Sequence, residues 1–143
     1  MADAVVAVGL DPAVGAKPGK KLNEAYEDLA VALGRAFPPE GQGNAAMLEA
    51  ILERGLTPTV ATDYERWRCL HWSLAVPEVM ERGGFNAIVG NPPFLGGQKL
   101  TGSMGENVRD WFVHVLASGQ RGSADLVAYF FLRAFNLLRP NGT

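Results

Sequence analysis

The spacing of apolar residues predicts three helices in the first part of the chain. Between residues 20 and 37, apolar side chains recur every three or four positions, which is the spacing of one helix face. Pro38 ends this helix, and Asn44 is a suitable N-cap for the next one, whose stop signal is Gly55. Residues 57–62 are rich in β-branched side chains and predict a short strand. The three helices are expected at residues 2–8, 20–37 and 45–54.

In the second part of the chain, the pattern predicts one buried strand and two longer helices. Residues 85–89 gather apolar and β-branched side chains into a short run, as in a strand that is covered on both faces. The strand must end at Gly90, because Pro92 and Pro93 follow and neither can donate to a sheet. The two helices are expected at residues 104–118 and 124–138. The second has Ser123 as its N-cap and is apolar almost all round, so it must be covered on several sides.

Lys99 and Asp125 are charged residues with both a structural and a functional interpretation. Residues 95–103 contain three glycines and little that packs, so we expect a loop there, and loops after a strand are often functional. Lys99 in this loop is a candidate contact to a phosphate group, and the alternative is a solvated lysine on a linker. Asp125 lies in the first turn of the last helix, where we interpret it as a capping residue rather than a catalytic one.

Composition narrows the class of protein. With 143 residues, 48% hydrophobic and 20% charged, the chain has the size and balance of one globular domain. Its formal net charge of -2 differs from the strongly basic charge of a free-standing nucleic-acid binder. Cys69 is a single cysteine, so neither an internal disulfide nor a zinc site is expected. The apolar start carries Asp3 and lacks a basic region, so we expect no membrane segment and a cytoplasmic location.

Aromatic and basic residues alternate between residues 64 and 72. Such interleaving can stack bases and neutralise phosphates. It is equally the pattern of an amphipathic segment whose aromatic rings pack inward while its arginines reach solvent, and this is the interpretation that we favour. The residues concerned are Tyr64, Arg66, Trp67, Arg68, His71 and Trp72.

The tetrapeptide after the expected strand, Asn91-Pro92-Pro93-Phe94, carries the most specific chemistry. The Pro-Pro step leaves the carbonyls of Asn91 and Pro92 with few neighbouring amides to bond, so they are free to accept from another group. The Asn91 side chain adds one acceptor and two donors, and Phe94 adds a flat apolar ring. A planar group with an exocyclic amino group fits this set. The alternative is an ordinary rigid turn in which Phe94 is a core residue.

The stretch FNAIVGNPPF, residues 85–94, resembles the NPP-aromatic motif of S-adenosylmethionine-dependent amino-methyltransferases. It looks most like the adenine-N6 DNA methyltransferases of bacterial restriction-modification and phage-defence systems. HWSLAVPEVMERGG, residues 71–84, and RGSADLVAYFFLRAFNLLRPNGT, residues 121–143, look like the segments that flank the motif in those enzymes. The resemblance divides the chain into a helical segment at residues 1–63 and the central part of a catalytic domain at residues 64–143.

This resemblance implies an α/β fold, namely a partial class I, Rossmann-like methyltransferase fold present as a helix-rich fragment around one catalytic-edge strand. Such enzymes hold their cofactor mainly by a glycine-rich turn after the first strand and an acidic residue after the second. The sequence contains neither, because the glycine-bearing stretch at residues 9–19 has no clear strand before it. We therefore assign no cofactor-binding residue, expect the remainder of a methyltransferase chain as a partner, and expect the isolated fragment to be inactive.

The function implied by the resemblance is methyl transfer from S-adenosylmethionine to the exocyclic amino group of an adenine flipped out of double-stranded DNA. The catalytic motif would be Asn91, Pro92, Pro93 and Phe94. Phe94 would stack on the base, the Asn91 side-chain oxygen and the Pro92 carbonyl would accept the two amino hydrogens, and Lys99 would contact the nucleic acid. The alternatives are an amino-methyltransferase acting on cytosine, RNA or protein glutamine, and a truncated, non-catalytic fragment.

Overall fold

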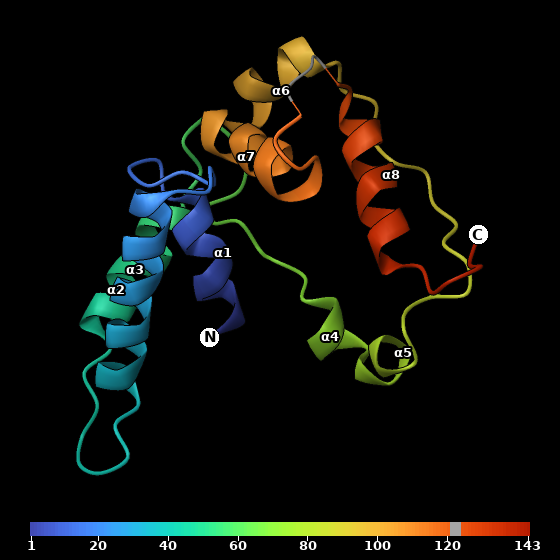
Figure 1. Cartoon of the computed structure of the whole chain (residues 1–143). Coiled ribbons are helices and arrows are strands. Elements are labelled where there is room, and N and C mark those ends of the chain that lie inside the picture. The colour runs from blue at the N-terminus through green and yellow to red at the C-terminus, as the bar shows by residue number, and fades with distance from the viewer. Residues whose placement is uncertain (121–123) are drawn as a thin grey trace.

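The computed structural model describes residues 1–120 and 124–143 of the chain, and its regular structure is helical (Figure 1). Most of the predicted helices occur where the sequence places them. The sequence predicts Ser123, which lies outside the described residues, as the N-cap of the last helix, but the N-cap is Asp125, so this prediction is wrong. The elements are α1 (Ala2–Leu10), α2 (Lys20–Ala36), α3 (Ala46–Leu56), α4 (Trp72–Ala75), α5 (Pro77–Glu81), α6 (Gly97–Met104), α7 (Glu106–Trp111), the π-helix η1 (Phe112–Leu116) and α8 (Leu126–Leu137).

Helices α1, α2 and α3 form a three-helix unit that holds the main apolar core. The two longer helices each turn one apolar stripe inward, as their spacing predicts. Helices α1 and α3 approach so closely that a Cβ atom on Gly55 would overlap the backbone carbonyl of Ala7. The buried residues of this unit are Ala4, Ala7, Val8, Leu10, Leu29, Ala32, Leu48, Ile51 and Leu56.

Asp11 ends α1 and ties it to α3. Its Oδ1 accepts a hydrogen bond from the backbone N–H of Ala13 at 2.8 Å, and its Oδ2 accepts one from Arg54 Nε at 2.9 Å. These partners compensate for the burial of the carboxylate, because a buried charge is tolerated when it is paired and hydrogen-bonded. Helix α1 therefore continues past Gly9, where the sequence predicts its end.

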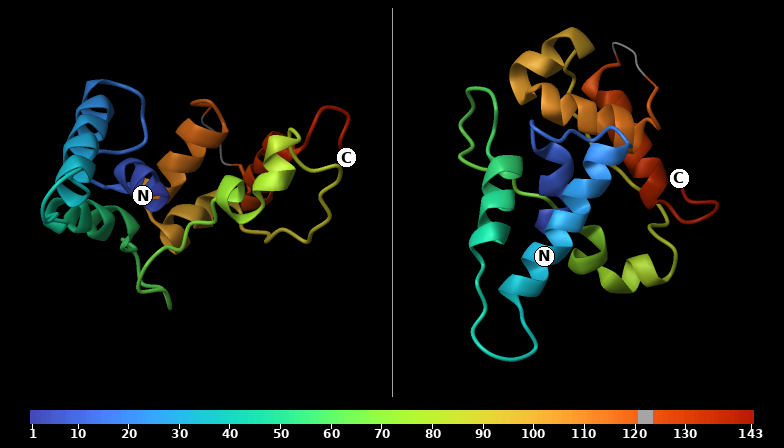
Figure 2. Two further views of the ribbon diagram at one scale, coloured as in Figure 1. Left: turned by 90° about the horizontal axis from the view of Figure 1, so that it is seen from below. Right: turned by 60° about the vertical axis from the view of Figure 1, so that its left-hand side comes forward.

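Helix α7 joins the three-helix unit to the second half of the chain. The buried Asn107 donates from Nδ2 to the backbone carbonyl of Leu10 at 2.7 Å and accepts a hydrogen bond from the Thr59 hydroxyl at 3.0 Å. Val108 enters the main core, and Phe112 at the start of η1 stacks on Tyr129 of α8 with ring centroids 5.2 Å apart. The left view of Figure 2 accordingly shows α7 and η1 between the α1–α3 unit and α8.

The expected α/β fold is wrong for this structure, because the described residues 1–120 and 124–143 contain helices and no strand. Residues 85–89 form only an isolated parallel bridge, between Phe85 and Leu138. A strand gains its stability from neighbours that pair with its edges and cover its faces, and Val89 is 97% exposed. Residues 85–89, whose composition suits a buried strand, therefore have few strand-like hydrogen bonds among the described residues.

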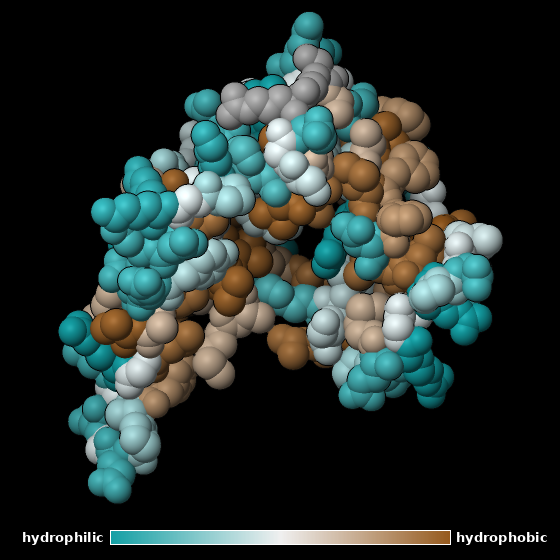
Figure 3. All heavy atoms as spheres, viewed as in Figure 1, coloured by the Kyte–Doolittle hydropathy of each residue, from teal (hydrophilic) through white to brown (hydrophobic). Residues whose placement is uncertain are grey.

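Three further expectations about local structure are corrected. Residues 57–62 are irregular rather than a strand, and the Thr59 side chain bonds to Asn107 instead. Residues 97–104, expected as a loop, form α6, because Leu100 is buried against α8 and outweighs the helix-breaking glycines. The apolar surface of α8 is not covered on all sides, since Phe131 is 67% and Phe135 is 76% exposed. Figure 3 shows apolar residues gathered on the α8 side of the molecule.

Candidate functional site

The segment that precedes the Asn91–Phe94 motif is held by backbone hydrogen bonds to the turn after α8. Phe85 N–H donates to the Leu137 carbonyl at 2.8 Å, and its own carbonyl accepts from Arg139 N–H at 3.0 Å. Thr143 then donates to the Asn86 carbonyl at 3.0 Å and accepts from Ile88 N–H at 2.9 Å. The pair of bonds at Phe85 forms a parallel bridge to Leu138. The chain therefore enters the motif from a fixed direction.

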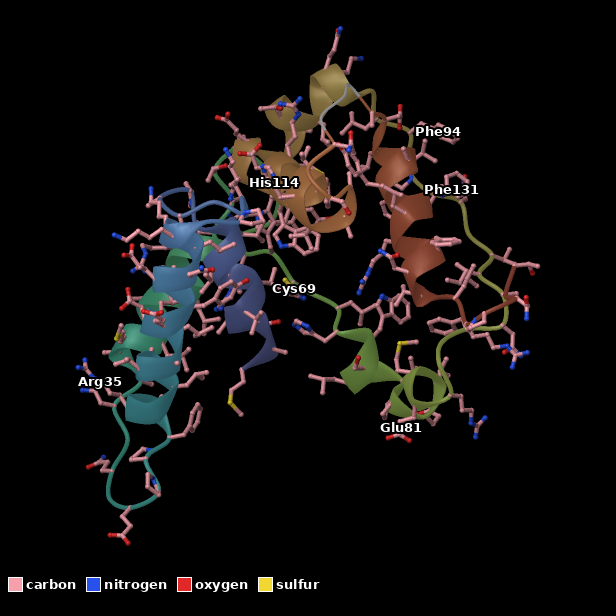
Figure 4. All side chains as sticks on the ribbon, viewed as in Figure 1. Arg35, Cys69, Glu81, Phe94, His114 and Phe131 are labelled. Carbon is pink, nitrogen blue, oxygen red and sulfur yellow. The ribbon has the colours of Figure 1, made fainter. Side chains whose placement is uncertain are left out.

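The motif residues are offered to solvent. Asn91 and Pro93 are exposed, Pro92 is half-buried and Phe94 is 79% exposed. Within residues 1–120 and 124–143, no hydrogen bond uses the side chain of Asn91 or the carbonyls of the four motif residues. Figure 4 shows Phe94 beside the N-terminal end of α8, with Phe131 further along that helix. Among the described residues, these acceptors of the motif are therefore left without a hydrogen-bond donor.

Asp125 binds the residue that follows the motif, Leu95, and the sequence does not predict this contact. Its Oδ1 caps α8 through Val127 N–H at 3.0 Å, in keeping with the predicted capping role, and also accepts from Leu95 N–H at 3.1 Å. A capping carboxylate can be recognised from sequence. Its second partner lies 30 residues away, and no local pattern predicts that contact.

Lys99 lies on the first turn of α6, a few residues after the motif. Its side chain is exposed, and with Gly96, Gly97 and Gln98 it lines an open depression of about 370 Å³. No carboxylate pairs with Lys99 in the part of the chain that the structure describes. A free ammonium group at this position is compatible with the predicted contact to nucleic acid.

The aromatic residues between 64 and 72 do not form one stacking surface. Trp67 packs against the main core, and Trp72 meets Phe85 edge to face at 5.3 Å, as the inward-packing interpretation predicts. Tyr64 alone is largely exposed. His71 Nε2–H donates to Asp3 Oδ1 at 2.7 Å, which fastens this segment to α1. The cluster is therefore structural.

The described residues do not fit an S-adenosylmethionine site. The glycine-bearing stretch at residues 9–19 follows a helix rather than a strand, and its acidic residue, Asp11, is already paired with Arg54. The cavity beside Asp11 measures about 70 Å³, whereas ligand pockets typically span about 300–1,000 Å³. Among the same residues, no group of three or more His, Cys, Asp or Glu side chains is placed to hold a metal ion.

The comparisons with known proteins identify the family. Residues 36–143 match the family model described as Eco57I restriction-modification methylase. The chain belongs to this family. The match covers the motif, Lys99 and Asp125, and begins at the end of α2. Neither the curated proteins nor the solved structures contain a match to the chain.

Membership of the Eco57I methylase family gives the chain its general activity. It is a restriction-modification DNA methyltransferase sequence, and methylases of this family generally use S-adenosylmethionine. No helix among the described residues is both long and apolar enough to cross a membrane.

Proposed function

We propose that this methylase transfers a methyl group to the exocyclic N6 amino group of an adenine in double-stranded DNA, and that the Asn91–Phe94 motif holds this amine. The exposure of the motif carries the proposal. Phe94 is 79% exposed beside a segment whose direction is fixed by hydrogen bonds. A motif that formed only a rigid turn would have Phe94 as a core residue.

Each motif residue has a role in this proposal. The Asn91 side-chain oxygen and the Pro92 carbonyl accept the two hydrogens of the amino group, which opposes delocalisation of the nitrogen lone pair into the ring. Pro93 keeps the loop stiff, because its ring fixes the backbone torsion φ. Phe94 stacks on the base after it has left the duplex. The main catalytic contributions are orientation and preorganised dipoles.

The methyl donor in this proposal is S-adenosylmethionine, which supplies an electrophilic methyl group. Because residues 9–19 offer no pocket of sufficient size for it, we assign its binding to the remainder of the methyltransferase. Lys99 contributes a positive charge near the motif and neutralises a DNA phosphate. An asparagine at the first motif position favours adenine over cytosine, since the cytosine enzymes that the motif resembles more commonly have serine there.

Substitution of Asn91 in the complete enzyme tests the proposal. Asn91→Ala should lower methyl transfer by about 100-fold to 1000-fold and leave S-adenosylmethionine binding intact, because the lost acceptor acts on the target amine. Phe94→Ala should mainly weaken capture of the base, since stacking is worth about 1–3 kcal/mol. Phe94→Tyr is the matched control and should retain activity. Mass spectrometry of nucleosides from treated DNA measures the product and its rate of formation.

Three results would refute the proposed function. Methylcytosine as the sole product would reject the adenine assignment. Wild-type turnover by the Asn91→Ala enzyme would reject the catalytic role of the motif. Methylation of RNA or of protein glutamine with no methylation of DNA would favour the alternative substrates that share this kind of motif.

A further inference from the structure

The contacts of Leu95 point to a second role for Asp125. Leu95 directly follows Phe94, and both of its backbone groups are bonded to the start of α8. Its N–H donates to Asp125 Oδ1 at 3.1 Å, and its carbonyl accepts from Leu126 N–H at 2.9 Å. The first residue after the motif is thus fixed by two hydrogen bonds to adjacent residues of one helix.

The Leu95 side chain strengthens this attachment. It packs against the cluster of Leu100, Leu126 and Tyr129, which joins α6 to α8. Leu95 is therefore attached to the start of α8 by the backbone bond from Leu126 N–H and by the packing of its side chain on this cluster. The end of the motif is held on α8 by apolar contact as well as by hydrogen bonds, whereas the motif itself is exposed.

One carboxylate oxygen performs two tasks at this position. Asp125 Oδ1 accepts from Val127 N–H at 3.0 Å, which caps α8, and from Leu95 N–H, which holds the loop. A carboxylate at a helix N-terminus is stabilised by the helix dipole, and charge-assisted hydrogen bonds are stronger than neutral ones. The position of the loop is therefore coupled to the end of the helix.

The motif is consequently held at both ends by the two ends of the same helix. Before the motif, Phe85 bonds to Leu137 at the end of α8. After the motif, Leu95 bonds to Asp125 at its start. The nine-residue stretch between Phe85 and Leu95 therefore spans the length of α8, and in Figure 1 it runs along the outer side of this helix. Releasing either end would free the motif to change its direction.

We propose that Asp125 is a positioning residue, which sets the direction of Asn91 and Phe94 by holding Leu95 on the end of α8. This inference rests on the proposed function of the motif. The role is indirect, because the Asp125 carboxylate accepts from the backbone N–H groups of Leu95 and Val127 and acts through Leu95. Loss of the contact to Leu95 should reduce turnover even when α8 remains capped.

Three substitutions of Asp125 in the complete enzyme distinguish its contact to Leu95, which holds the loop, from its contact to Val127, which caps α8. Asp125→Asn keeps the side-chain oxygen in place and should retain turnover within about threefold, since asparagine is an equally good N-cap. Asp125→Ser still caps α8, but its shorter side chain does not reach Leu95. We expect this variant to lose about 10-fold to 100-fold in turnover at saturating DNA, because small misplacements of reacting groups are costly. Asp125→Ala loses both contacts and should also melt at a lower temperature.

A double substitution provides a readout that a purely structural role would not affect. If Asp125 acts through the motif, adding Asp125→Ser to an Asn91→Ala enzyme should lower the remaining turnover by less than threefold, because the effects of residues that act as a unit do not multiply. Asn44→Ala is the matched control. It removes a side-chain contact of 3.0 Å from the start of α3, far from the motif, and should leave turnover unchanged.

The outcomes distinguish this inference from the proposed function. If Asn91→Ala abolishes methylation while Asp125→Ser has wild-type turnover, the positioning role is overturned and the motif assignment stands. A full multiplicative loss in the double variant would overturn it as well. If Asn91→Ala itself has wild-type turnover, the proposed function fails first. A lowered turnover of Asp125→Ser, with S-adenosylmethionine affinity and melting temperature unchanged, supports the inference.

Discussion

At the scale of single residues, exposure separates side chains that hold the fold from those that can be substituted without unfolding it. Leu56 is 0% exposed and lies in the main core, whereas Phe94 is 79% exposed. Truncating a buried leucine typically costs about 2–5 kcal/mol, and substitutions at exposed positions usually stay within about 0.5 kcal/mol. Loss of activity in Phe94→Ala therefore reports on chemistry and not on unfolding.

The thiol of Cys69 should react slowly at neutral pH. Burial raises the pKa of this thiol above its ordinary value, the negative charge of Asp3 raises it further, and Arg66 lowers it. A raised pKa leaves less thiolate at a given pH, and the thiolate is the reactive species. Asp3→Asn removes one of the raising charges, so it should shift the pH profile of alkylation to lower pH.

Iodoacetamide alkylation, followed by peptide mass spectrometry, measures this profile. The denatured protein is the control, because Asp3 and Cys69 are 66 positions apart in the sequence and do not stay close once the chain unfolds. Identical profiles for the folded wild type and the folded Asp3→Asn protein would contradict the assigned influence of Asp3.

The residues of the motif could be predicted from sequence, but not all of the hydrogen bonds that hold the motif in place. Asn91 to Phe94 form a local pattern of proline, amide and aromatic ring, and such a pattern is visible in one line of sequence. The bond from Leu95 to Asp125 depends on how α8 packs. Asp11 and Asn107 are likewise buried polar residues whose partners lie far along the chain, so sequence reasoning assigned them no role.

At the scale of elements, the contact between α1 and α3 depends on the absence of a side chain at Gly55. A Cβ atom there would overlap the Ala7 carbonyl, so Gly55→Ala should force the two helices apart. Overpacking of this kind typically costs about 1–3 kcal/mol. Hydrogen exchange of the α1 amides in the complete enzyme measures the local loss of stability.

Gly34→Ala is the matched control for this prediction. Gly34 lies inside α2, and nothing lies within 4 Å of a Cβ atom built there. The substitution should stabilise α2 by about 0.5–1 kcal/mol, because alanine loses less backbone entropy than glycine in a helix. Equal protection of α1 in the Gly55→Ala and wild-type proteins would contradict the close approach.

Helices were easier to predict than the strand or α6. A helix closes its own hydrogen bonds, so its apolar spacing and end signals are local, as in α2 and α8. A strand needs partners, and residues 85–89 pair, among the described residues, only with the end of α8 and the turn after it. The glycines of α6 argue against a helix, and the burial of Leu100 outweighs them only in the packed structure.

At the scale of the whole molecule, the 143-residue chain leaves a large apolar surface uncovered. The exposed apolar side chains around α8 and the segment before the motif are Ile88, Val89, Phe94, Phe130, Phe131, Leu132 and Phe135. Such surface promotes association in water. We therefore expect the chain on its own to form oligomers and to bind the dye ANS. A monodisperse monomer with a sharp cooperative melt and no dye binding would contradict this expectation.

The isolated chain should also bind S-adenosylmethionine weakly or not at all. The cavity beside Asp11 is about 70 Å³, and Arg54 already occupies the Asp11 carboxylate. Calorimetric titration of the 143-residue chain measures the affinity. Micromolar binding that is lost in an Asp11→Asn variant would contradict the prediction and assign residues 9–19 to the cofactor. Gly34→Ala serves as the control for nonspecific effects of substitution.

The bond between Asn107 and the Leu10 carbonyl joins positions that are 97 residues apart. During synthesis, Leu10 therefore leaves the ribosome well before Asn107. Helices α1 to α3 have all their mutual contacts within the first 56 residues, so they can assemble soon after leaving the ribosome. Helix α7 emerges much later and docks on a surface that already exists. Doubling the length of a closing loop raises the entropic free-energy cost of closure by only about 0.6 kcal/mol. The long separation therefore delays this contact but lowers the stability of the folded protein only slightly. We therefore expect the half of the chain that carries the motif to fold against the α1–α3 unit after that unit has formed.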